Sequence, residues 1–429
     1  MKIAVIGGAS ARTPLLVNGL AHSNLPIDEI ALFDPDEDRL RIIASVAGTF
    51  APCVRTCDDP RRCISGATFV ILSIRAGGIA ARVRDEAIAI EHGTIGQETV
   101  GPAGFAMAMR NIPPAIEYAR LVAREAPRAW IVNSTNPVGI IMQAMTAAGA
   151  RVIGICDTPT ELFEDVAHVL GLDSSQCHFD YFGLNHLGWL REVYCDGAPQ
   201  LSRLWSEPTL LEQVYRTPLF DPAFLRTLRL LPTDYLFYYY RTAAARDNTR
   251  AAGQTRGQAI AALNEQLFRD LAKPGGGRPR VYEEYLQARN AGYMQIESGA
   301  ARPTAPRAWA ELTGYDKIAL HVIAAIHSQS NAILPLNVAN RGALSDLTDD
   351  DIVELPCVVN GNGAHPLAVG SVPDVARDLL VRVKEYERLT VAASSARSVD
   401  AAVRALAHNP LVGDRALAER LVDALQPLW

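Results

Sequence analysis

Residues 151–191 have the sequence RVIGICDTPTELFEDVAHVLGLDSSQCHFDYFGLNHLGWLR, and the rest of the chain is organised around this stretch. Its apolar run at residues 152–155 predicts a buried strand, and the Thr-Pro pair that follows predicts the start of an amphipathic helix ending at Leu170. A second apolar run, at residues 179–184, predicts another strand. Open α/β sheets bind their ligands at strand ends, where this stretch would place Cys156, Asp157, Asn185 and His186.

A thiol and an imidazole with an oxygen donor suit a borderline divalent cation that keeps open positions for a substrate. The competing interpretation is a buried structural cysteine beside a hydrogen-bonded core histidine, because unligated buried cysteines are common. For these two residues taken alone, both interpretations remain open.

The N-terminal segment predicts a nucleotide-binding unit. An apolar strand at residues 2–7 leads through a loop and a helix to a second strand at residues 29–33, which ends at Asp34. An acidic residue at this place holds the ribose hydroxyls in dinucleotide enzymes. The loop departs from the G-x-G-x-x-G pattern, because Ala9 and Arg12 stand where further glycines are expected.

Two more strands, at residues 67–74 and 130–132, alternate with helices, so we expect a doubly wound parallel sheet through about residue 155. Beyond Arg191 the pattern is mostly helical, and Asn-Gly-Asn-Gly at residues 360–363 predicts a β-hairpin. The fold class is therefore α/β, with a Rossmann-like N-terminal sheet and a mostly helical C-terminal α+β part.

Composition limits the function classes. A chain of 429 residues suggests two domains, and its formal charge of −6 gives no basic footprint for nucleic acid. We expect no membrane span, because no apolar stretch reaches about 18 residues, and no signal peptide, because the chain enters a strand directly. Seven cysteines, an odd number, favour a reduced, cytoplasmic protein.

Short motifs follow one another along the chain in a specific order. They are Gly7-Gly8-x-Ser10-x-x-Thr13-Pro14, Asp34, Arg75-x-Gly77, Gly96-Gln97-Glu98-Thr99, Asn136-Pro137, Cys156-Asp157-x-Pro159, Gly183-Leu184-Asn185-His186, Pro232-x-x-Tyr235-Leu236, Thr255-Arg256 and Val353-Glu354-x-Pro356-Cys357. Together they resemble glycoside hydrolase family 4, the NAD- and manganese-dependent glycosidases that include 6-phospho-α- and 6-phospho-β-glucosidases. The resemblance implies an NAD-binding Rossmann-like domain at residues 1–193, a catalytic and oligomerisation domain at residues 194–429, and a homodimer or homotetramer.

The resemblance also implies site residues. Cys156 and His186 match the ligands of Mn²⁺ or another divalent metal, Tyr235 matches the catalytic base, and Asp157 matches the general acid. The residues matched to the sugar are Glu98, Asn136, Asn185, Arg256 and Arg75. The residues matched to NAD are Gly7, Gly8, Ser10, Ala11, Arg12, Asp34, Arg75 and Asn136.

The implied reaction differs from two-carboxylate glycoside hydrolysis. NAD⁺ accepts a hydride from C3 of the sugar, Tyr235 removes the acidified C2 proton, and Asp157 protonates the departing glycosidic oxygen. Water then adds, and the hydride returns. The metal, chelated by O2 and O3, acts as a Lewis acid. A tyrosine of pKa about 10 needs a cation nearby to act as a base, and the metal and Arg256 are candidates. Asp157 must hold a proton, so we expect burial to raise its pKa.

The chain departs from the family pattern at residues 9–12, near the expected cofactor phosphates and sugar.

The sequence leaves open whether the substrate is the α or the β anomer. Asp157 is typical of the α-glucosidases, whereas the segments at residues 363–367 and 386–390 resemble the β branch. Cys-His at positions 156–157, typical of members acting on unphosphorylated sugars, is absent. The candidates for binding a 6-phosphate are Arg75, Arg82, Arg110 and Arg256.

Three alternatives compete with a phospho-glycosidase. The first is a family 4 glycosidase of unphosphorylated sugars. The second is a dehydrogenase of the lactate/malate type, which would share the N-terminal sheet but leave Tyr235 and Cys156 without a role. The third is a nucleotide sensor without catalysis, which only the altered loop supports.

Overall fold

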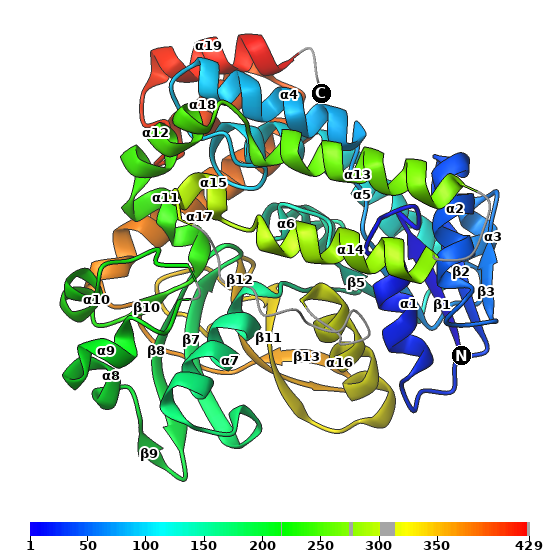
Figure 1. Cartoon of the computed structure of the whole chain (residues 1–429), viewed down its shortest axis with the longest axis horizontal. Coiled ribbons are helices and arrows are strands. Elements are labelled where there is room, and N and C mark those ends of the chain that lie inside the picture. Colours follow the sequence, from blue (N-terminus) through cyan, green and yellow to red (C-terminus); the bar gives the residue numbers. More distant parts are fainter. Residues whose placement is uncertain (216, 274–277, 301–313, 427–429) are drawn as a thin grey trace.

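The computed structural model describes residues 1–215, 217–273, 278–300 and 314–426. Within these residues the core is a sheet of nine strands in the order β13-β12-β11-β6-β5-β4-β1-β2-β3 (Figure 1). Its strands are β1 (Lys2–Ile6), β2 (Glu29–Phe33), β3 (Val54–Thr56), β4 (Phe69–Leu72), β5 (Trp130–Asn133), β6 (Val152–Gly154), β11 (Ala332–Ala339), β12 (Ile352–Asn360) and β13 (Gly363–Pro366).

The six strands from β6 to β3 are parallel. They form the predicted doubly wound sheet, to which the structure adds the short edge strand β3 that had not been predicted. β1 and β4 consist almost entirely of buried apolar residues, as expected for parallel strands covered on both faces. Strand order reverses between β1 and β4, and such reversal points are where open α/β sheets bind ligands. The fold thus directs attention to the loops that follow these two strands.

Three strands from the second half of the chain extend the same sheet. β12 and β13 form the hairpin that the Asn-Gly-Asn-Gly segment predicts, with Asn360 paired to Gly363. β11 joins the hairpin to β6 and runs antiparallel to both β6 and β12. The sequence had not indicated this connection, because the partner of a strand is not encoded in its own residues. The central sheet therefore combines strands from both halves of the sequence.

A smaller antiparallel sheet lies beside the large one and contains β7 (Cys177–Leu184), β8 (Leu187–Cys195), β9 (Ala198–Pro199) and β10 (Leu231–Pro232). β7 is the predicted strand, but β8, which continues past Arg191, had not been predicted. A tight turn at Asn185-His186 joins β7 to β8, and His186 adopts a positive φ of 61° there. Because β6 and β7 belong to different sheets, Cys156 and His186 follow strands of two sheets rather than two neighbouring strands of one sheet.

Helices cover both faces of the large sheet, since right-handed crossovers on either side of β1 and β4 place their helices on opposite faces. These helices form two packed groups. In one group α1 contacts α2 and α16, and in the other α5 contacts α3, α6 and α17. The helices of the first half are α1 (Thr13–Ala21), α2 (Glu37–Ala47), α3 (Pro60–Ile64), α4 (Gly78–Glu91), α5 (Gly101–Glu125), α6 (Val138–Ala147) and α7 (Thr158–Leu170). Those that follow are α8 (Ser202–Ser206), α9 (Pro208–Leu211), α10 (Pro222–Leu228), α11 (Phe237–Tyr240), α12 (Thr242–Ala252), α13 (Arg256–Ala272), α14 (Arg278–Ala291), α15 (Gln295–Ser298), α16 (Tyr315–Ser328), α17 (Asp374–Ala396), α18 (Val399–His408) and α19 (Arg415–Leu425).

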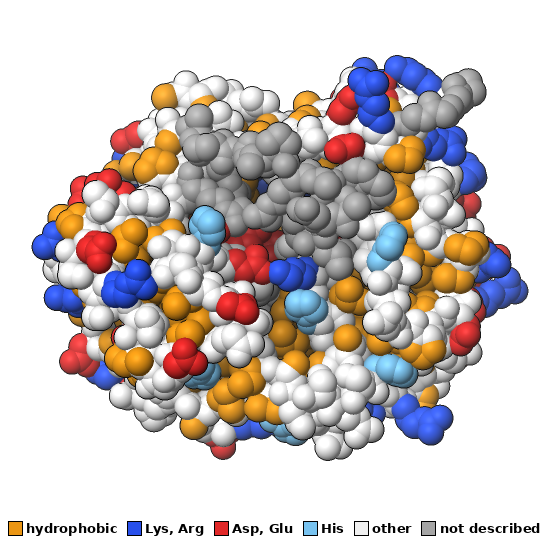
Figure 2. Space-filling model, turned by 60° about the horizontal axis from the view of Figure 1, so that its bottom comes forward, with side chains coloured by type: hydrophobic (Ala, Val, Ile, Leu, Met, Phe, Trp, Pro, Cys, Tyr) orange, Lys and Arg blue, Asp and Glu red, His pale blue; other side chains and the backbone are white. Residues whose placement is uncertain are grey.

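The last helices confirm the predicted helical C-terminal segment up to residue 426, beyond which the chain lies outside the described residues. Acidic and basic side chains are interspersed over the face that Figure 2 shows. None of the described helices has the length and apolar character that crossing a membrane requires.

Candidate functional site

A cavity of about 1460 Å³ opens at the point where strand order reverses. The loops after β1 and β4 line it from one side, and α13 and α14 contribute residues from the second half of the chain. Gly7 makes the close approach of the two loops possible: its φ is +93°, and a Cβ at this position would lie 2.1 Å from the carbonyl oxygen of Ser73. A side chain at residue 7 would therefore push the loops apart.

The loop after β1 is fastened to the end of β2. The backbone N–H of Ala9 donates to Asp34 Oδ2 at 3.1 Å, and the N–H of Asp36 donates to Asp34 Oδ1 at 3.0 Å. The residues predicted to bind the cofactor line the cavity, except Gly8, where a Cβ would lie 3.0 Å from that of Leu32. Those in the lining are Gly7, Ser10, Ala11, Arg12, Asp34, Arg75 and Asn136.

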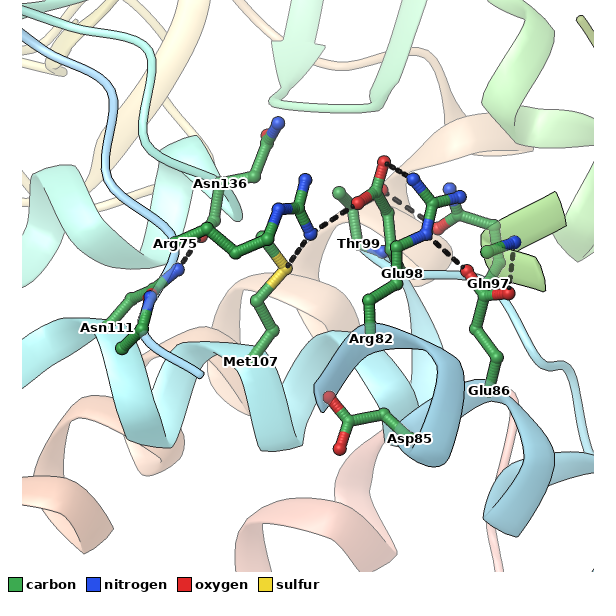
Figure 3. A network of polar contacts seen from close by, with 12 residues as sticks. Arg75, Arg82, Asp85, Glu86, Gln97, Glu98, Thr99, Met107, Asn111 and Asn136 are labelled. Atoms are coloured by element: carbon green, nitrogen blue, oxygen red, sulfur yellow. Dashed lines mark hydrogen bonds and ion pairs between the residues drawn. The ribbon is translucent and has the colours of Figure 1, made fainter. Parts of the chain in front are cut away.

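Glu98 is held between two arginines (Figure 3). Arg75 Nη1 lies 2.7 Å from Glu98 Oε2, and Arg82 Nη1 lies 2.9 Å from Glu98 Oε1. Burial opposes ionisation of this carboxyl, but the two arginines prevail and lower the pKa of Glu98 to about 2. Glu98 therefore carries a fixed negative charge at the cavity wall and can accept hydrogen bonds from sugar hydroxyls.

Asp157 lies in a second charged cluster, which α16 completes. Arg12 Nη2 is 3.8 Å from Asp157 Oδ2, Arg12 Nε is 4.0 Å from Asp316 Oδ2, and the Arg12 guanidinium lies over the Tyr315 ring. Burial raises the pKa of Asp157, with Arg12 opposing, as the sequence predicts for a group that must hold a proton. No motif pointed to Tyr315 or Asp316, because α16 reaches the site only through the tertiary fold.

His186 is fixed in one tautomer by its neighbours. Gln97 Oε1 accepts hydrogen bonds from the backbone N–H groups of Thr99 and Val100 and from the Thr99 hydroxyl at 2.8 Å. Because its proton is used in this way, the Thr99 hydroxyl must accept from His186 Nδ1, which lies 2.9 Å away. Burial lowers the pKa of His186 to about 3, so the ring is neutral. Its Nε2 therefore carries a free lone pair.

That lone pair suits a metal ion. His186 Nε2 is buried and has no hydrogen-bond partner among the described residues, while Nδ1–H is held from behind, as is usual for metal-binding histidines. The described residues contain no group of three or more His, Cys, Asp and Glu side chains arranged around a metal position. The predicted pair of protein ligands, Cys156 and His186, would leave the other positions of a divalent ion to substrate and water.

Tyr235 connects the predicted metal ligands to the cavity. Its ring stacks on His186 with centroids 3.7 Å apart and an interplanar angle of 1°. Burial raises the pKa of Tyr235 well above its usual range, and Glu98, Asp157 and Cys156 raise it further. The positive charge of Arg82, which the sequence had not indicated for this role, opposes these effects.

The predicted site residues thus fall into two layers. Cys156 and His186 lie behind the cavity wall, at 1% and 3% exposure, and Asn185 donates to the buried Glu354 at 3.3 Å. The predicted residues that line the cavity on the sugar side are Arg75, Glu98, Asn136, Asp157, Tyr235 and Arg256. Arg289 of α14 also lines it, although the sequence offered no motif that could have identified it.

Comparisons with known proteins agree over the whole chain. The Family 4 glycosyl hydrolase profile matches residues 2–172, and that of the Family 4 glycosyl hydrolase C-terminal domain matches residues 181–412. The 6-phospho-beta-glucosidase of Thermotoga maritima is 29% identical over 99% of this chain and 97% of its own length. A phospho-alpha-glucosidase of Clostridium acetobutylicum is 27% identical over 99% of this chain and 96% of its own length.

Solved structures support the same relationship. The Thermotoga maritima 6-phospho-beta glucosidase, solved with manganese, NAD⁺ and glucose-6-phosphate, has a TM-score of 0.84 and 28% identity, over 100% of this chain and 98% of its own. A lactate dehydrogenase from a marine metagenome has a TM-score of 0.54 at 15% identity, which shows a shared fold alone.

Proposed function

Because the chain belongs to the family 4 glycosyl hydrolases, we propose that it hydrolyses 6-phospho-glucosides with the help of NAD⁺ and a divalent metal such as Mn²⁺. The observation that carries the proposal is one cavity lined both by the cofactor loop and by the candidate catalytic residues Asp157 and Tyr235. Its volume of about 1460 Å³ leaves room for a dinucleotide with a sugar phosphate beside it. The relatives with α- and β-glucosidase names cover nearly the full chain.

The charges around the cavity support a phosphorylated substrate. Of the four predicted phosphate ligands, Arg75 and Arg82 pair with Glu98, and Arg110 pairs with Asp85. Arg256 and Arg289 also line the cavity, and neither has a carboxylate within 4.0 Å in the part of the chain that the structure describes. A phosphate dianion would supply the missing counter-charge.

These two arginines lie next to each other. Arg256 Nη2 donates to the carbonyl oxygen of Arg289 at 2.6 Å. Burial lowers the pKa of Arg256, and the positive charges of Arg289 and Arg82 lower it further. Two arginines that line the same cavity are well suited to bind a phosphoryl group through several donors. We therefore assign the 6-phosphate to Arg256 and Arg289.

The remaining roles are those that the family resemblance implies. NAD⁺ and the metal would supply hydride acceptance at C3 and Lewis acidity at its oxygen. Tyr235 takes the C2 proton, and Arg82 is the described cation that favours the phenolate this requires. Asp157, whose pKa is raised by burial, donates its proton to the glycosidic oxygen. We further propose that the protein is cytoplasmic, as its odd number of cysteines favours, and that it forms a homodimer or homotetramer, as the family resemblance implies.

The test is turnover of p-nitrophenyl 6-phospho-α- and 6-phospho-β-glucoside with NAD⁺, Mn²⁺ and a reductant, each omitted in turn. We expect activity to require all the components, and the preferred anomer to settle the role of Asp157. Activity on the unphosphorylated glucosides alone would overturn the substrate class. Turnover that continues without NAD⁺ would overturn the mechanism.

A separate experiment tests the assignment of the 6-phosphate to Arg289. Arg289→Gln should raise KM for the phosphorylated substrate about tenfold or more, whereas NAD⁺ affinity should not change. Arg280→Gln, on the same helix but exposed and paired with Glu284, serves as the matched control. An equal rise in KM in both variants would contradict the assignment of the phosphate to Arg289.

A further inference from the structure

We propose that Arg82 and Glu86 form a buried positioning pair that holds Glu98 and Arg256 at a fixed separation on the sugar side of the cavity. The inference rests on the proposed function, in which Glu98 and Arg256 bind the sugar phosphate. Glu86 has no role in the reaction described above, and Arg82 enters that reaction only through its charge, which lowers the pKa of Tyr235. Their contribution would be to align two groups that come from distant parts of the chain.

The contacts form a continuous chain (Figure 3). Arg82 Nη1 lies 2.9 Å from Glu98 Oε1, and Arg82 Nε donates to Glu86 Oε1 at 2.7 Å. The other oxygen, Glu86 Oε2, accepts from the backbone N–H of Gly257 at 2.7 Å. Gly257 directly follows Arg256, the first residue of α13. Two hydrogen bonds to one carboxylate thus connect the Glu98 loop to the start of α13.

The glycine at position 257 is adapted to this contact. A Cβ there would lie 2.6 Å from Glu86 Oε2 and 2.9 Å from Glu86 Cδ. Any side chain at residue 257 would displace the carboxylate from the helix N-terminus, where the unpaired N–H groups favour a negative charge. The sequence therefore provides both the carboxylate and the space for it.

Stability alone is a weak reason for such a pair. Arg82 is 5% exposed and Glu86 is fully buried, and removing two charges from water costs free energy that their attraction repays only in part. The pair does, however, fix geometry, because the planar guanidinium bonds two carboxylates in set directions. Displacing a substrate-binding group by about 1 Å can lower turnover about a hundredfold.

Two substitutions break the link in different ways. Glu86→Gln keeps the side-chain shape but turns one acceptor oxygen into a donor, so it opposes either Arg82 or the Gly257 N–H. Gly257→Ala changes no charge and displaces the carboxylate sterically. Asp85→Asn is the matched control, because Asp85 is an equally buried carboxylate on the same helix, paired with Arg110 and outside the cavity lining.

The experiment measures kcat, KM, NAD⁺ affinity and thermal stability of the full-length enzyme with the preferred 6-phospho-glucoside. We expect Glu86→Gln and Gly257→Ala each to lower kcat/KM about tenfold to a hundredfold, with NAD⁺ affinity unchanged and Asp85→Asn within about twofold of the wild type. Equal losses in Asp85→Asn would overturn the proposal, since general loosening of α4 would then explain them.

A double-mutant cycle separates positioning from packing. If Glu86 acts through Arg256, Gly257→Ala should cost less than about twofold in an Arg256→Gln background. An undiminished loss in that background would overturn the proposal even if Glu86→Gln does not fold. A wild-type enzyme that neither binds nor hydrolyses 6-phospho-glucosides would overturn the proposed function, and this inference with it. If the wild type is active and Glu86→Gln and Gly257→Ala leave kcat/KM unchanged, this inference is overturned and the proposed function stands.

Discussion

At the scale of single residues, the Thr99 hydroxyl determines what His186 can do. It donates to Gln97 and accepts from His186 Nδ1, which leaves Nε2 with its lone pair. Thr99→Val removes the acceptor, so the buried ring loses its fixed orientation. We expect Mn²⁺ affinity, measured by titration of the enzyme without substrate, to fall about tenfold to a hundredfold.

The control for this prediction is Thr94→Val. Thr94 is equally buried, lies in the same loop region, and donates to the carbonyl oxygen of Ala89 at 3.1 Å. If both variants lose Mn²⁺ affinity equally, the effect belongs to the packing of the loop. Unchanged affinity in Thr99→Val would show that the histidine does not need this neighbour.

Asp316 makes the stability of the protein depend on pH. Burial raises its pKa from 3.8 to about 7 although Arg12 opposes the shift. A carboxyl whose pKa is raised on folding binds more protons in the native state, so its effect on stability becomes less favourable as pH rises from about 4 to 7. Asp316→Asn lacks this dependence. The melting temperature of the variant relative to the wild type should therefore be higher at pH 8 than at pH 5.

The comparison between the two pH values is the decisive one. The ion pair with Arg12 forms only where Asp316 is ionised, and its effect is already contained in the pKa of about 7, so it does not change the sign of the expected difference. A difference in melting temperature that stays constant from pH 5 to pH 8 would contradict the raised pKa of Asp316.

At the scale of elements, α17 carries a fully buried ion pair. Lys384 is 0% exposed and bonds Glu387 one turn further along, and a Cβ on Gly139 of α6 would lie 2.8 Å from Glu387 Oε1. Lys384→Met would leave the Glu387 carboxylate buried without its partner. We expect the free energy of unfolding, from urea titration, to fall by about 3–5 kcal/mol.

A second substitution tests the explanation. In the double variant Lys384→Met/Glu387→Leu no unpaired charge remains, and most of the lost stability should return. If the double variant is as unstable as the single one, the pair itself stabilises the packing of α17 on α6. That result would refute an account based on desolvation.

The elements that were predicted correctly share a local signal. The alternation of apolar strands with helices predicted β1, β2, β4, β5 and β6 but not the short β3, and the Asn-Gly-Asn-Gly segment predicted the β12–β13 hairpin. β8 lacks such a signal, because its apolar residues 187–190 follow β7 after only two residues and resemble a continuation of it. β11 pairs with β6 through one pair of residues, Asn337 and Gly154. No local sequence pattern specifies this pairing.

The same distinction holds for the site. Motifs with fixed spacing allowed Glu98, Asp157 and Tyr235 to be predicted at the cavity, and the structure places all three in its lining. Arg289 and Asp316 could not be predicted. An arginine in a helix or an aspartate at a helix start is typical of solvent-exposed surfaces, and only the packing of α14 and α16 brings these two residues to the cavity.

At the scale of the whole molecule, the two halves of the sequence depend on each other. Glu354 of β12 accepts hydrogen bonds from Tyr181 at 2.7 Å and from Asn185, both on the other side of residue 193. α16 packs on α1, and α17 packs on α5 and α6. A division at residue 193 thus remains a proposal about NAD binding and catalysis, while the fold itself extends across the boundary.

This dependence predicts the behaviour of the isolated fragment 1–193. Without the second half, the edge of β6 loses its neighbour β11, and the apolar faces of α5 and α6 lose α17. Buried Tyr181 would also lose its acceptor, Glu354. An exposed strand edge beside uncovered apolar helices favours aggregation over folding. We therefore expect no cooperative thermal transition and no NAD⁺ binding from the fragment alone, and recovery of both when residues 194–429 are co-expressed. Cooperative unfolding with full NAD⁺ affinity in fragment 1–193 would mean that the six parallel strands suffice, and that the later strands and helices only add the catalytic side chains.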